Sequence, residues 1–323
     1  MCTALTFYAD HHYFGRNLDL DKRYDERVVI TPRNYILRYK SGEIHRRHFA
    51  IIGMATVIDD YPLYYDAINE HGLSIAALNF VGNAYYNSHK PSSINITPYE
   101  IIPYLLGICK SVDEAEDVLR KINLTNIDFK EDIKNSELHW IISDKNRSIT
   151  VESLKSGLMI YSNDIGILTN NPPFEFHIMN LNNYLNITNQ DCNPRFSDQI
   201  KLNKYSKGMG GIGLPGDNSS MSRFVRCAFT KLNSVIPQNE SDCMTQVFHI
   251  LTSVAQVEGS VVSGEKREKT QYMSCCDMDS CAYYYKTYNN SQINVVTLFN
   301  ENIDSDKLIS YKMIDTQNIN KIN

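Results

Sequence analysis

The sequence predicts an α+β fold in which β-sheets pack on each other with helices outside. Short apolar runs separated by turn residues fill the first 80 residues and return near the end of the chain. Runs with helical spacing lie between them, at 98–122 and 219–257. The chain has 323 residues, of which 42% are hydrophobic, enough to bury a large core. The elements follow the order strands, helices, strands, helices and strands. This order indicates a layered sandwich.

The first half of the chain contains strands and then two helices. Apolar runs at 50–57 and 73–80 are typical of buried strands. Helical spacing over 98–122 predicts two helices, the second opened by Ser111, because Glu114 three residues later completes a capping box. Three further apolar runs predict strands at 138–143, 148–153 and 158–161.

The middle of the chain changes from ordered runs to an irregular segment. A short buried run at 165–169 ends at consecutive asparagines and prolines, and we expect a helix over 174–184. Residues 185–216 are polar and show no clear periodicity, which is typical of a long functional loop.

The last third of the chain predicts two helices and closing strands. Ser219 or Ser220 is expected to cap a helix that runs to 235, and Ser241 a second helix that runs to 257. Apolar runs at 273–287 and 292–299 flank a polar stretch, and we interpret them as strands joined by a hairpin turn.

Charge and composition exclude several classes of partner. The net charge is −5 and no basic cluster is long enough to follow a phosphate backbone, so we expect no nucleic acid partner. No apolar stretch reaches the roughly 18 residues of a membrane span, and the N-terminus lacks the basic and apolar regions of a signal peptide. We therefore expect no membrane partner and a cytoplasmic location.

Eight cysteines are scattered along the chain and do not form a small disulfide framework. Cys275, Cys276 and Cys281 are close in sequence, but they lack a CxxC pair and a nearby histidine. We expect no metal, and we interpret the adjacent pair as strand residues that face opposite sides.

Cys2 is the first candidate for chemistry. Removal of Met1 would leave a cysteine with both a thiol and a free α-amine. An α-amine titrates at about pH 8 and a thiol at about pH 8.5, so the amine can take the thiol proton without a histidine. A second-position cysteine alone is weak evidence. The apolar run that follows, and Arg16 and Asp19 one short hairpin later, strengthen it because their charges could flank the N-terminus.

The sequence resembles the choloylglycine hydrolase family of N-terminal-nucleophile amidases, which holds the bile salt hydrolases and penicillin V acylases. The resemblance covers nearly the whole chain through spaced matches, none specific alone. The matches are Phe14-Gly15-Arg16-Asn17-Leu18-Asp19, Asp59-Asp60-Tyr61-Pro62, Asn69-Glu70-His71-Gly72-Leu73, Ala77-Leu78-Asn79-Phe80, Leu138-His139-Trp140, Gly166-Ile167-Leu168-Thr169-Asn170, Gly213-Leu214-Pro215-Gly216-Asp217, Ser222-Arg223-Phe224 and Thr270-Gln271-Tyr272. It implies a four-layer αββα sandwich, one domain over 1–323 with Met1 removed, no cofactor, and a homo-oligomer, commonly a tetramer.

The resemblance also implies roles for charged residues around the N-terminus. Cys2 would be the nucleophile, with its own α-amine as general base and then acid. Arg16 and Arg223 would flank the thiolate and favour it over the thiol, and Asp19 would hold the α-amine. Without the resemblance, each arginine reads as a surface ion-pair residue and Asp19 as a turn aspartate.

Two asparagines complete the candidate catalytic set. Asn79 and Asn170 end strands that are expected to be buried, and the resemblance implies oxyanion and positioning roles. Read alone, asparagines at strand ends are turn residues. Penicillin V acylases commonly carry tyrosine at the family position of Asn79, and bile salt hydrolases carry asparagine, so this residue favours a bile salt substrate.

A conjugated bile salt is an amphipathic steroid joined by an amide to glycine or taurine, so its pocket should be mostly apolar. The candidate walls are Leu18, Tyr24, Ile58, Tyr65, Phe129 and Ile133. Alternatives are a penicillin V acylase, an acyltransferase that passes the same acyl-enzyme to an amino acid, and a non-catalytic sandwich with an inert Cys2.

Overall fold

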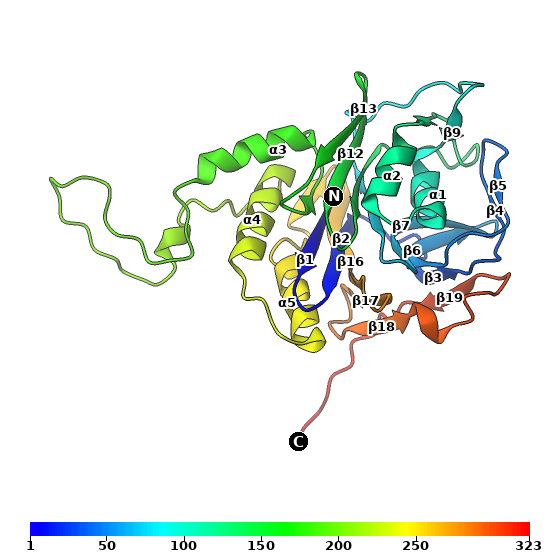
Figure 1. Ribbon diagram of the computed structural model, residues 1–323. Coiled ribbons are helices and arrows are strands. Elements are labelled where there is room, and N and C mark those ends of the chain that lie inside the picture. Colours follow the sequence, from blue (N-terminus) through cyan, green and yellow to red (C-terminus); the bar gives the residue numbers. More distant parts are fainter.

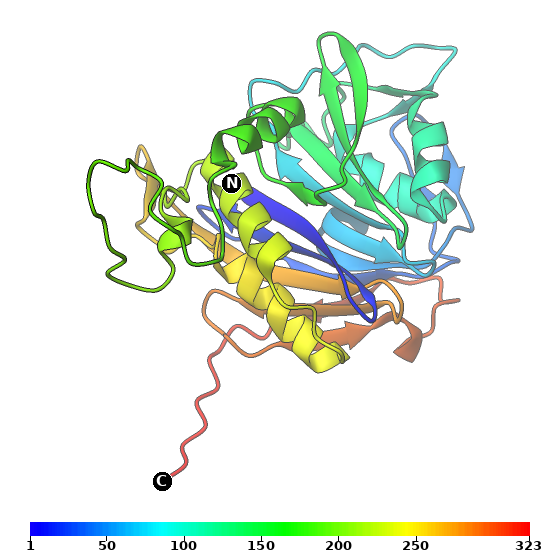
Figure 2. The ribbon, with the colours of Figure 1, turned by 60° about the vertical axis from the view of Figure 1, so that its left-hand side comes forward.

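Two β-sheets lie face to face, and helices cover the outer face of each (Figures 1 and 2). The structure is a computed structural model that describes residues 1–323. The layer order helix, sheet, sheet, helix confirms the predicted four-layer αββα sandwich. No helix is both long and apolar enough to cross a membrane.

The first sheet contains the N-terminal strand and has seven strands. Its strands lie in the order β14-β1-β2-β16-β17-β18, and β15 pairs with one end of β16. They are β1 (Cys2–Tyr8), β2 (His12–Leu20), β14 (Ile167–Leu168), β15 (Val261–Ser263), β16 (Lys266–Asp277), β17 (Ala282–Thr287) and β18 (Asn294–Thr297). The first two strands form the predicted hairpin, and strands from the end of the chain complete the sheet around them.

The second sheet is built from the middle of the sequence and has eight strands in the order β13-β12-β11-β8-β7-β6-β3-β19. They are β3 (Arg27–Thr31), β6 (Ile51–Ile58), β7 (Tyr61–Asn69), β8 (Ser74–Asn79), β11 (Leu138–Ser143), β12 (Ser148–Leu154), β13 (Gly157–Ser162) and β19 (Ile309–Lys312). Two small two-stranded sheets lie outside it. They pair β4 (Leu37–Arg38) with β5 (Ile44–His45), and β9 (Ile94–Ile96) with β10 (Ile122–Leu124).

The helices divide between the two outer faces. Helix α1 (Ile101–Ile108) packs on β6, β7 and β8, and α2 (Val112–Leu119) joins the same apolar cluster. Helix α4 (Ser220–Asn233) packs on β1 and β14, and α5 (Glu240–Thr252) packs on β2 and β16. Helix α3 (Phe174–Leu181) contacts α4. The ends of β1, β2, β8 and β14 therefore meet between layers that are packed on both sides.

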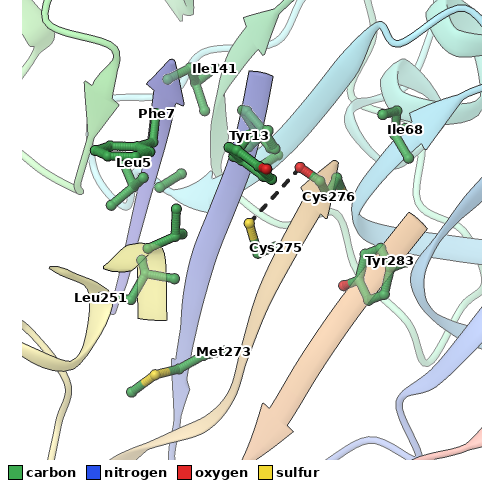
Figure 3. Packing of buried hydrophobic residues seen from close by; sticks show 14 of the residues in the cluster. Leu5, Phe7, Tyr13, Ile68, Ile141, Leu251, Met273, Cys275, Cys276 and Tyr283 are labelled. Atoms are coloured by element: carbon green, nitrogen blue, oxygen red, sulfur yellow. Dashed lines mark hydrogen bonds between the residues drawn. The ribbon is translucent and has the colours of Figure 1, made fainter. Parts of the chain in front are cut away.

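Buried apolar side chains form two clusters, one around the first sheet and one between the second sheet and its helices. Figure 3 shows part of the first, with Tyr13 of β2, Cys275 and Cys276 of β16 and Tyr283 of β17 on neighbouring strands of the sheet. Alternation along β16 turns the two cysteine side chains to opposite faces of the sheet, as predicted. Both are fully buried, so their chemistry here is that of small apolar residues.

Two sequence predictions were wrong in detail. Helix α5 begins after Asn239, whose side chain accepts from the Asp242 backbone, and not after Ser241. It ends at Thr252 and not at 257. The prediction was too long because the buried Val254 continues the apolar spacing beyond the helix. The run 273–287 is two strands. The turn between them was hidden because Met278 and Cys281 are buried there like strand residues.

Other predicted elements are confirmed with small changes. The helices over 98–122 and 174–184, the three strands between them and the closing hairpin are present. Ser111 accepts from the Glu114 backbone as expected, but the Glu114 carboxylate accepts from the Lys110 N–H, so the capping box is only half formed.

Residues 185–216, here called the arm, extend away from the sandwich between α3 and α4 (Figure 1). The arm contains only one turn of 3₁₀ helix, at Met209–Gly211. Leu185, Phe196 and Tyr205 are 81%, 81% and 82% exposed. The arm therefore carries large apolar side chains that are exposed in the single chain.

Candidate active site

Cys2 begins the strand β1 and is nearly enclosed, with 2% of its surface exposed. It pairs across the hairpin with Leu18 of β2. The structure describes the unprocessed chain, in which Met1 continues the strand pairing. The Met1 amine donates to the Asp19 carbonyl over 2.6 Å and to the Glu268 carboxylate over 2.7 Å. Backbone pairing in the first sheet therefore fixes the position of Cys2, independently of the side chains around its sulfur.

Arg16 is the group that contacts the Cys2 sulfur. Its Nη2 lies 2.9 Å from Sγ, and its Nη1 donates to the carbonyls of Tyr65 and Ala77 over 2.9 and 3.0 Å. The side chain is fully buried, so its charge is poorly screened by water. The Arg16 guanidinium is therefore placed to donate a hydrogen bond to the sulfur throughout a reaction at Cys2.

Asp66 balances the charge of Arg16, and the sequence analysis did not identify it. Its Oδ1 lies 3.9 Å from Arg16 Nε, and the carboxylate accepts hydrogen bonds of 2.6 to 2.8 Å from three hydroxyls. Those hydroxyls belong to Tyr272, Ser274 and Tyr283 of the first sheet. Because Asp66 is satisfied by them, it offsets the Arg16 charge without taking the donor that faces Cys2. Its signal in the sequence was an aspartate in an otherwise apolar strand, 50 residues from its partner.

Arg223, from the first turns of α4, contacts the Cys2 backbone and not its sulfur. Nη1 donates to the Cys2 carbonyl and, over 2.7 Å, to Thr3 Oγ1, and Nη2 donates to Asn170 Oδ1 over 2.7 Å. Burial lowers the pKa of the Arg223 guanidinium, and the negative charge of Asp19 opposes this. Arg16 therefore contacts the sulfur itself, and Arg223 contacts the Cys2 main chain. The predicted roles of the two arginines at the thiolate stay predictions.

The orientation of the Asn170 amide is set by its neighbours. Oδ1 accepts from Cys2 N over 2.8 Å and from Arg223, both of which are donors, so Nδ2 must face the other way. There it donates to the Asn79 carbonyl over 2.8 Å. Asn170 is thus placed to hold the Cys2 nitrogen, while its own donor is already occupied.

Two buried histidines hold the backbone that carries Asn170. His177 of α3 donates from Nε2 to the Asn170 carbonyl over 2.8 Å, and His139 Nε2 lies 2.9 Å from the Thr169 carbonyl. His139 Nδ1 in turn lies 3.0 Å from the carboxylate of Glu152. Neither ring contacts Cys2, which agrees with the expectation that the mechanism needs no histidine.

Asp19 lies on the helix-facing side of β2 and is fully buried. Its Oδ1 accepts from the Thr270 hydroxyl over 2.6 Å, and its Oδ2 has no hydrogen-bond partner. Burial raises the pKa of the Asp19 carboxyl, and the charges of Arg223, the N-terminal amine and Arg16 and the Thr270 hydrogen bond oppose this. An unpartnered carboxylate oxygen beside the chain terminus is a ready acceptor for an ammonium group.

A cavity of about 590 Å³ opens beside Cys2 between the two sheets. All six residues predicted as substrate contacts lie in its wall, as do Cys2 and Asn79. The sequence analysis missed the remaining wall residues: Leu20, Thr56, Leu63, Tyr64, Ala77, Pro98, Tyr99, Asp132, Lys134, Ser136 and Leu138. The Asn79 side-chain amide forms no hydrogen bond within the protein, so it is the free neutral donor at the nucleophile's end of the cavity.

Clusters outside this site have structural explanations. His11, Asp277 and Asp279 bring three possible ligand atoms within 4.8 Å of one another. Asp277, however, already accepts from the backbones of Asp279 and Ser280, so it closes the turn after β16. All eight cysteines are free, and burial raises the pKa of Cys227 to about 12, which leaves its thiol protonated and unreactive.

These groups can perform nucleophilic acyl transfer. The sulfur has a fixed guanidinium, its main chain is held by Arg223 and Asn170, and a largely apolar cavity with a neutral amide donor begins at the same point.

Comparison with known proteins agrees with this arrangement. The family model of linear amide C–N hydrolases, choloylglycine hydrolase family, matches residues 2–311. The chain is 52% identical to the bile salt hydrolase/transferase of Lactiplantibacillus plantarum over 314 residues, 97% of each chain.

Solved structures agree as well. A mutant conjugated bile acid hydrolase from Clostridium perfringens matches over all of both chains with a TM-score of 0.93 and 36% identity. A penicillin V acylase from Agrobacterium tumefaciens shares the fold with a TM-score of 0.76 over 98% of this chain and 94% of its own, at 18% identity. The chain therefore belongs to the choloylglycine hydrolase family of linear amide C–N hydrolases.

Proposed function

We propose that this enzyme, after removal of Met1, hydrolyses the amide bond of glycine- or taurine-conjugated bile salts. The observation that carries the proposal is the cavity of about 590 Å³ that ends at the Cys2 sulfur. The names of the relatives support the substrate class, because a bile salt hydrolase/transferase is 52% identical over 97% of the chain. Penicillin V acylase is a more distant relative at 18% identity.

In the proposed first step, the Cys2 thiolate attacks the amide carbonyl carbon. The carbonyl π electrons move to oxygen, and the Asn79 amide donates to this oxyanion. When the oxyanion collapses, the C–N bond breaks and the leaving nitrogen takes a proton from the Cys2 α-ammonium, which had received it from the thiol. A thioester and free glycine or taurine result.

In the second step, water attacks the thioester carbonyl. The Cys2 α-amine takes a proton from the water, the C–S bond breaks, and the bile acid leaves. Arg16 stabilises the departing thiolate, and Asp19 and Asn170 hold the α-amine in place. No metal or organic cofactor takes part in either step.

The apolar wall fits a steroid better than a small polar acyl group. Leu18, Ile58, Tyr65, Phe129 and Ile133 contribute hydrophobic surface. Tyr24 lies at the outer part of the wall with 47% of its surface exposed, where an amphipathic ligand meets water.

The test is release of glycine and taurine from conjugated bile salts by protein whose intact mass shows Met1 removed, with penicillin V assayed in parallel. We expect Cys2→Ala to lower turnover at least about 10³-fold. Cys192→Ala is the matched control, because this cysteine lies on the arm outside the cavity. If penicillin V were turned over faster than the conjugated bile salts, the proposed substrate would be wrong and the proposed mechanism would stand. Unchanged turnover in Cys2→Ala would overturn both.

A second activity, transfer of the acyl group to an amino acid, uses the same thioester. Four relatives, at 52%, 38%, 36% and 36% identity, carry the name bile salt hydrolase/transferase. An amine that replaces water in the second step forms a new amide. The measurement is the ratio of new conjugate to free bile acid as amino acids are added to the turnover mixture.

We further propose a cytoplasmic homotetramer with one 1–323 domain per subunit. The exposed apolar side chains of the arm support the assembly, because a surface of this kind is stable when another subunit covers it.

A further inference from the structure

Thr270-Gln271-Tyr272 lies in β16, next to the strand that carries Arg16 and Asp19. The pairing register shifts there, since Thr270 faces Asp19 and Tyr272 faces Leu18, leaving Gln271 as an extra residue. This is a β-bulge, and bulges change the face to which a side chain points.

The bulge turns two neighbouring side chains toward opposite sides of Cys2. The Tyr272 hydroxyl donates to Asp66 between the two sheets, and the Asp66 carboxylate lies beside Arg16. Thr270 donates to Asp19 on the helix-facing side. In a regular strand without the register shift, Thr270 would lie on the same face as Tyr272, two positions along, and Gln271 would pair with Asp19 in its place.

The Thr270 hydroxyl has a fixed direction. Its oxygen accepts from the Gln256 backbone N–H over 2.7 Å, so its own hydrogen must point to Asp19 Oδ1, 2.6 Å away. The Thr270 N–H donates to the Gln256 carbonyl over 3.1 Å, which ties the same residue to the segment after α5. Asp19 Oδ1 is thus occupied, and Oδ2 is the oxygen left without a partner.

We propose that Thr270 is a positioning residue for the hydrolytic reaction, which holds Asp19 ionised and presents its Oδ2 to the Cys2 α-amine. This inference rests on the proposed function. Two hydrogen bonds in series, from the Gln256 N–H to Thr270 and from the Thr270 hydroxyl to Asp19, supply a donor to this buried carboxylate. The second oxygen of the carboxylate, Oδ2, has no donor. Thr270 itself is not in the cavity wall, so its effect reaches the substrate only through Asp19.

The charges around Asp19 define the expected pH effect. Arg223 approaches from α4, Arg16 from β2 and the N-terminal amine from β1, and Glu268 of β16 shares that amine. Burial raises the pKa of the Asp19 carboxyl, and the Thr270 hydrogen bond lowers it. Loss of the hydroxyl therefore moves protonation of Asp19 to higher pH, and activity should fail earlier on acidification.

The experiment compares Thr270→Val, Thr270→Ser and Thr270→Ala in full-length protein with Met1 removed. Valine keeps the shape and loses the hydroxyl. Serine and alanine leave the same space and differ by one oxygen, so this pair carries the test if the valine variant does not fold. Thr125→Val, a buried threonine on another part of the fold, controls for general loss of stability.

We expect Thr270→Val and Thr270→Ala to lower kcat about tenfold or more at the acid end of the pH profile, with KM within about twofold of wild type. Thr270→Ser should follow the wild-type profile, and Thr125→Val should not move its acid limb. Equal losses in serine and alanine variants, or a change in KM alone, would overturn the proposal.

A readout without substrate separates this proposal from the proposed function. If wild-type protein hydrolyses no conjugated bile salt, the substrate proposal fails, but the pH dependence of Cys2 alkylation by iodoacetamide still reports on the α-amine and its support. The acid limb of this profile should move in the alanine variant and not in the serine variant. If the alkylation profiles of the alanine and serine variants coincided, the Thr270 hydroxyl would have no role in supporting the α-amine.

Discussion

Arg16 illustrates how a buried charge can be held in place and remain available. A fully buried guanidinium is costly unless its donors are satisfied. The Arg16 donors are distributed over three carbonyls and one sulfur, and a carboxylate lies nearby. The carboxylate, Asp66, stays 3.9 Å away because three hydroxyls hold it. A direct two-point pair between Arg16 and Asp66 would remove the donor that Cys2 needs.

His177 carries a prediction about acid stability. Burial lowers the pKa of His177 to about 4, whereas a histidine in the unfolded chain has a pKa of about 6.5. Between these values the unfolded state binds more protons, so the free energy of unfolding falls as the pH is lowered through this window. The contribution of His177 to this loss is roughly 3 kcal/mol.

The variant His177→Gln retains a side-chain N–H donor for the Asn170 carbonyl and cannot titrate. We expect it to be less stable than wild type at pH 7, with the difference shrinking or reversing near pH 4.5. Urea unfolding at both pH values measures this. The exposed His89→Gln is the control. Wild-type and His177→Gln stabilities that fall in parallel would show that the ring does not titrate in this window.

Residue identities were easier to predict than residue partners. Cys2, Arg16, Asp19, Asn79, Asn170 and Arg223 could be named because short sequence matches mark them. Asp66, Thr270 and His177 act through contacts that span from 7 to 251 positions. Nothing local distinguishes a buried aspartate that faces three hydroxyls from one in a turn. The roles of these residues in the reaction remain predictions.

At the scale of elements, pairing between strands positions the catalytic groups. Strand β2 lies between β1 and β16, so Arg16 and Asp19 project to opposite faces of one strand beside Cys2. Strand β7 brings Asp66 from the facing sheet. The position of β7 therefore affects the site without any direct contact with Cys2.

Gly53 tests this dependence on β7. A Cβ at Gly53 would lie 2.2 Å from the Asp66 carbonyl and 2.4 Å from the Ala67 Cβ, so β7 must move to admit it. We expect Gly53→Ala to lower the free energy of unfolding by about 3 kcal/mol and to lower kcat as Asp66 shifts. Urea unfolding and turnover measure the two effects.

Gly216→Ala is the matched control, because open space surrounds its position. It should change stability by no more than about 0.5 kcal/mol. A Gly53→Ala protein as stable and active as this control would show that the two strands separate more easily than their close packing indicates.

Patterns with a clear period were predicted well, and irregular boundaries were not. The helices over 98–122 and 174–184 follow from apolar spacing. The turn between β16 and β17 could not be found, because Met278 and Cys281 are buried and Asp277 supplies the turn's hydrogen bonds from within an apolar run. Strand β19 was also missed: it lies at the edge of its sheet, and its outward residues are polar.

At the scale of the whole molecule, the arm is the feature that the sandwich itself does not explain. It leaves the body between α3 and α4, and Phe176 and Met179 on the outside of α3 are 60% and 70% exposed. Leu185 and Phe196 of the arm are exposed as well, and exposed apolar side chains of this size favour the proposed contact with another subunit.

We expect the combined variant Leu185→Ser, Phe196→Ser and Tyr205→Ser to have a smaller molar mass in solution than wild type. Light scattering on a sizing column measures this, with circular dichroism as the test of folding. The exposed Val81→Ser on the opposite part of the chain is the control. A wild-type mass retained by the triple variant would assign the assembly to another surface.

The pairing of Met1 has a consequence for the biosynthesis of the enzyme. In the folded chain its carbonyl accepts from the Asp19 N–H over 2.9 Å, and its amine is held by Glu268, 267 residues later. Because an aminopeptidase needs a free, extended terminus, we expect the proposed removal of Met1 to precede this pairing. At about 5 to 20 residues per second, the ribosome reaches Glu268 on the order of ten to fifty seconds after Met1. We expect that interval to be the time available for removal of Met1. Rapid overproduction that exhausts the aminopeptidase should then yield folded molecules that lack the proposed catalytic amine.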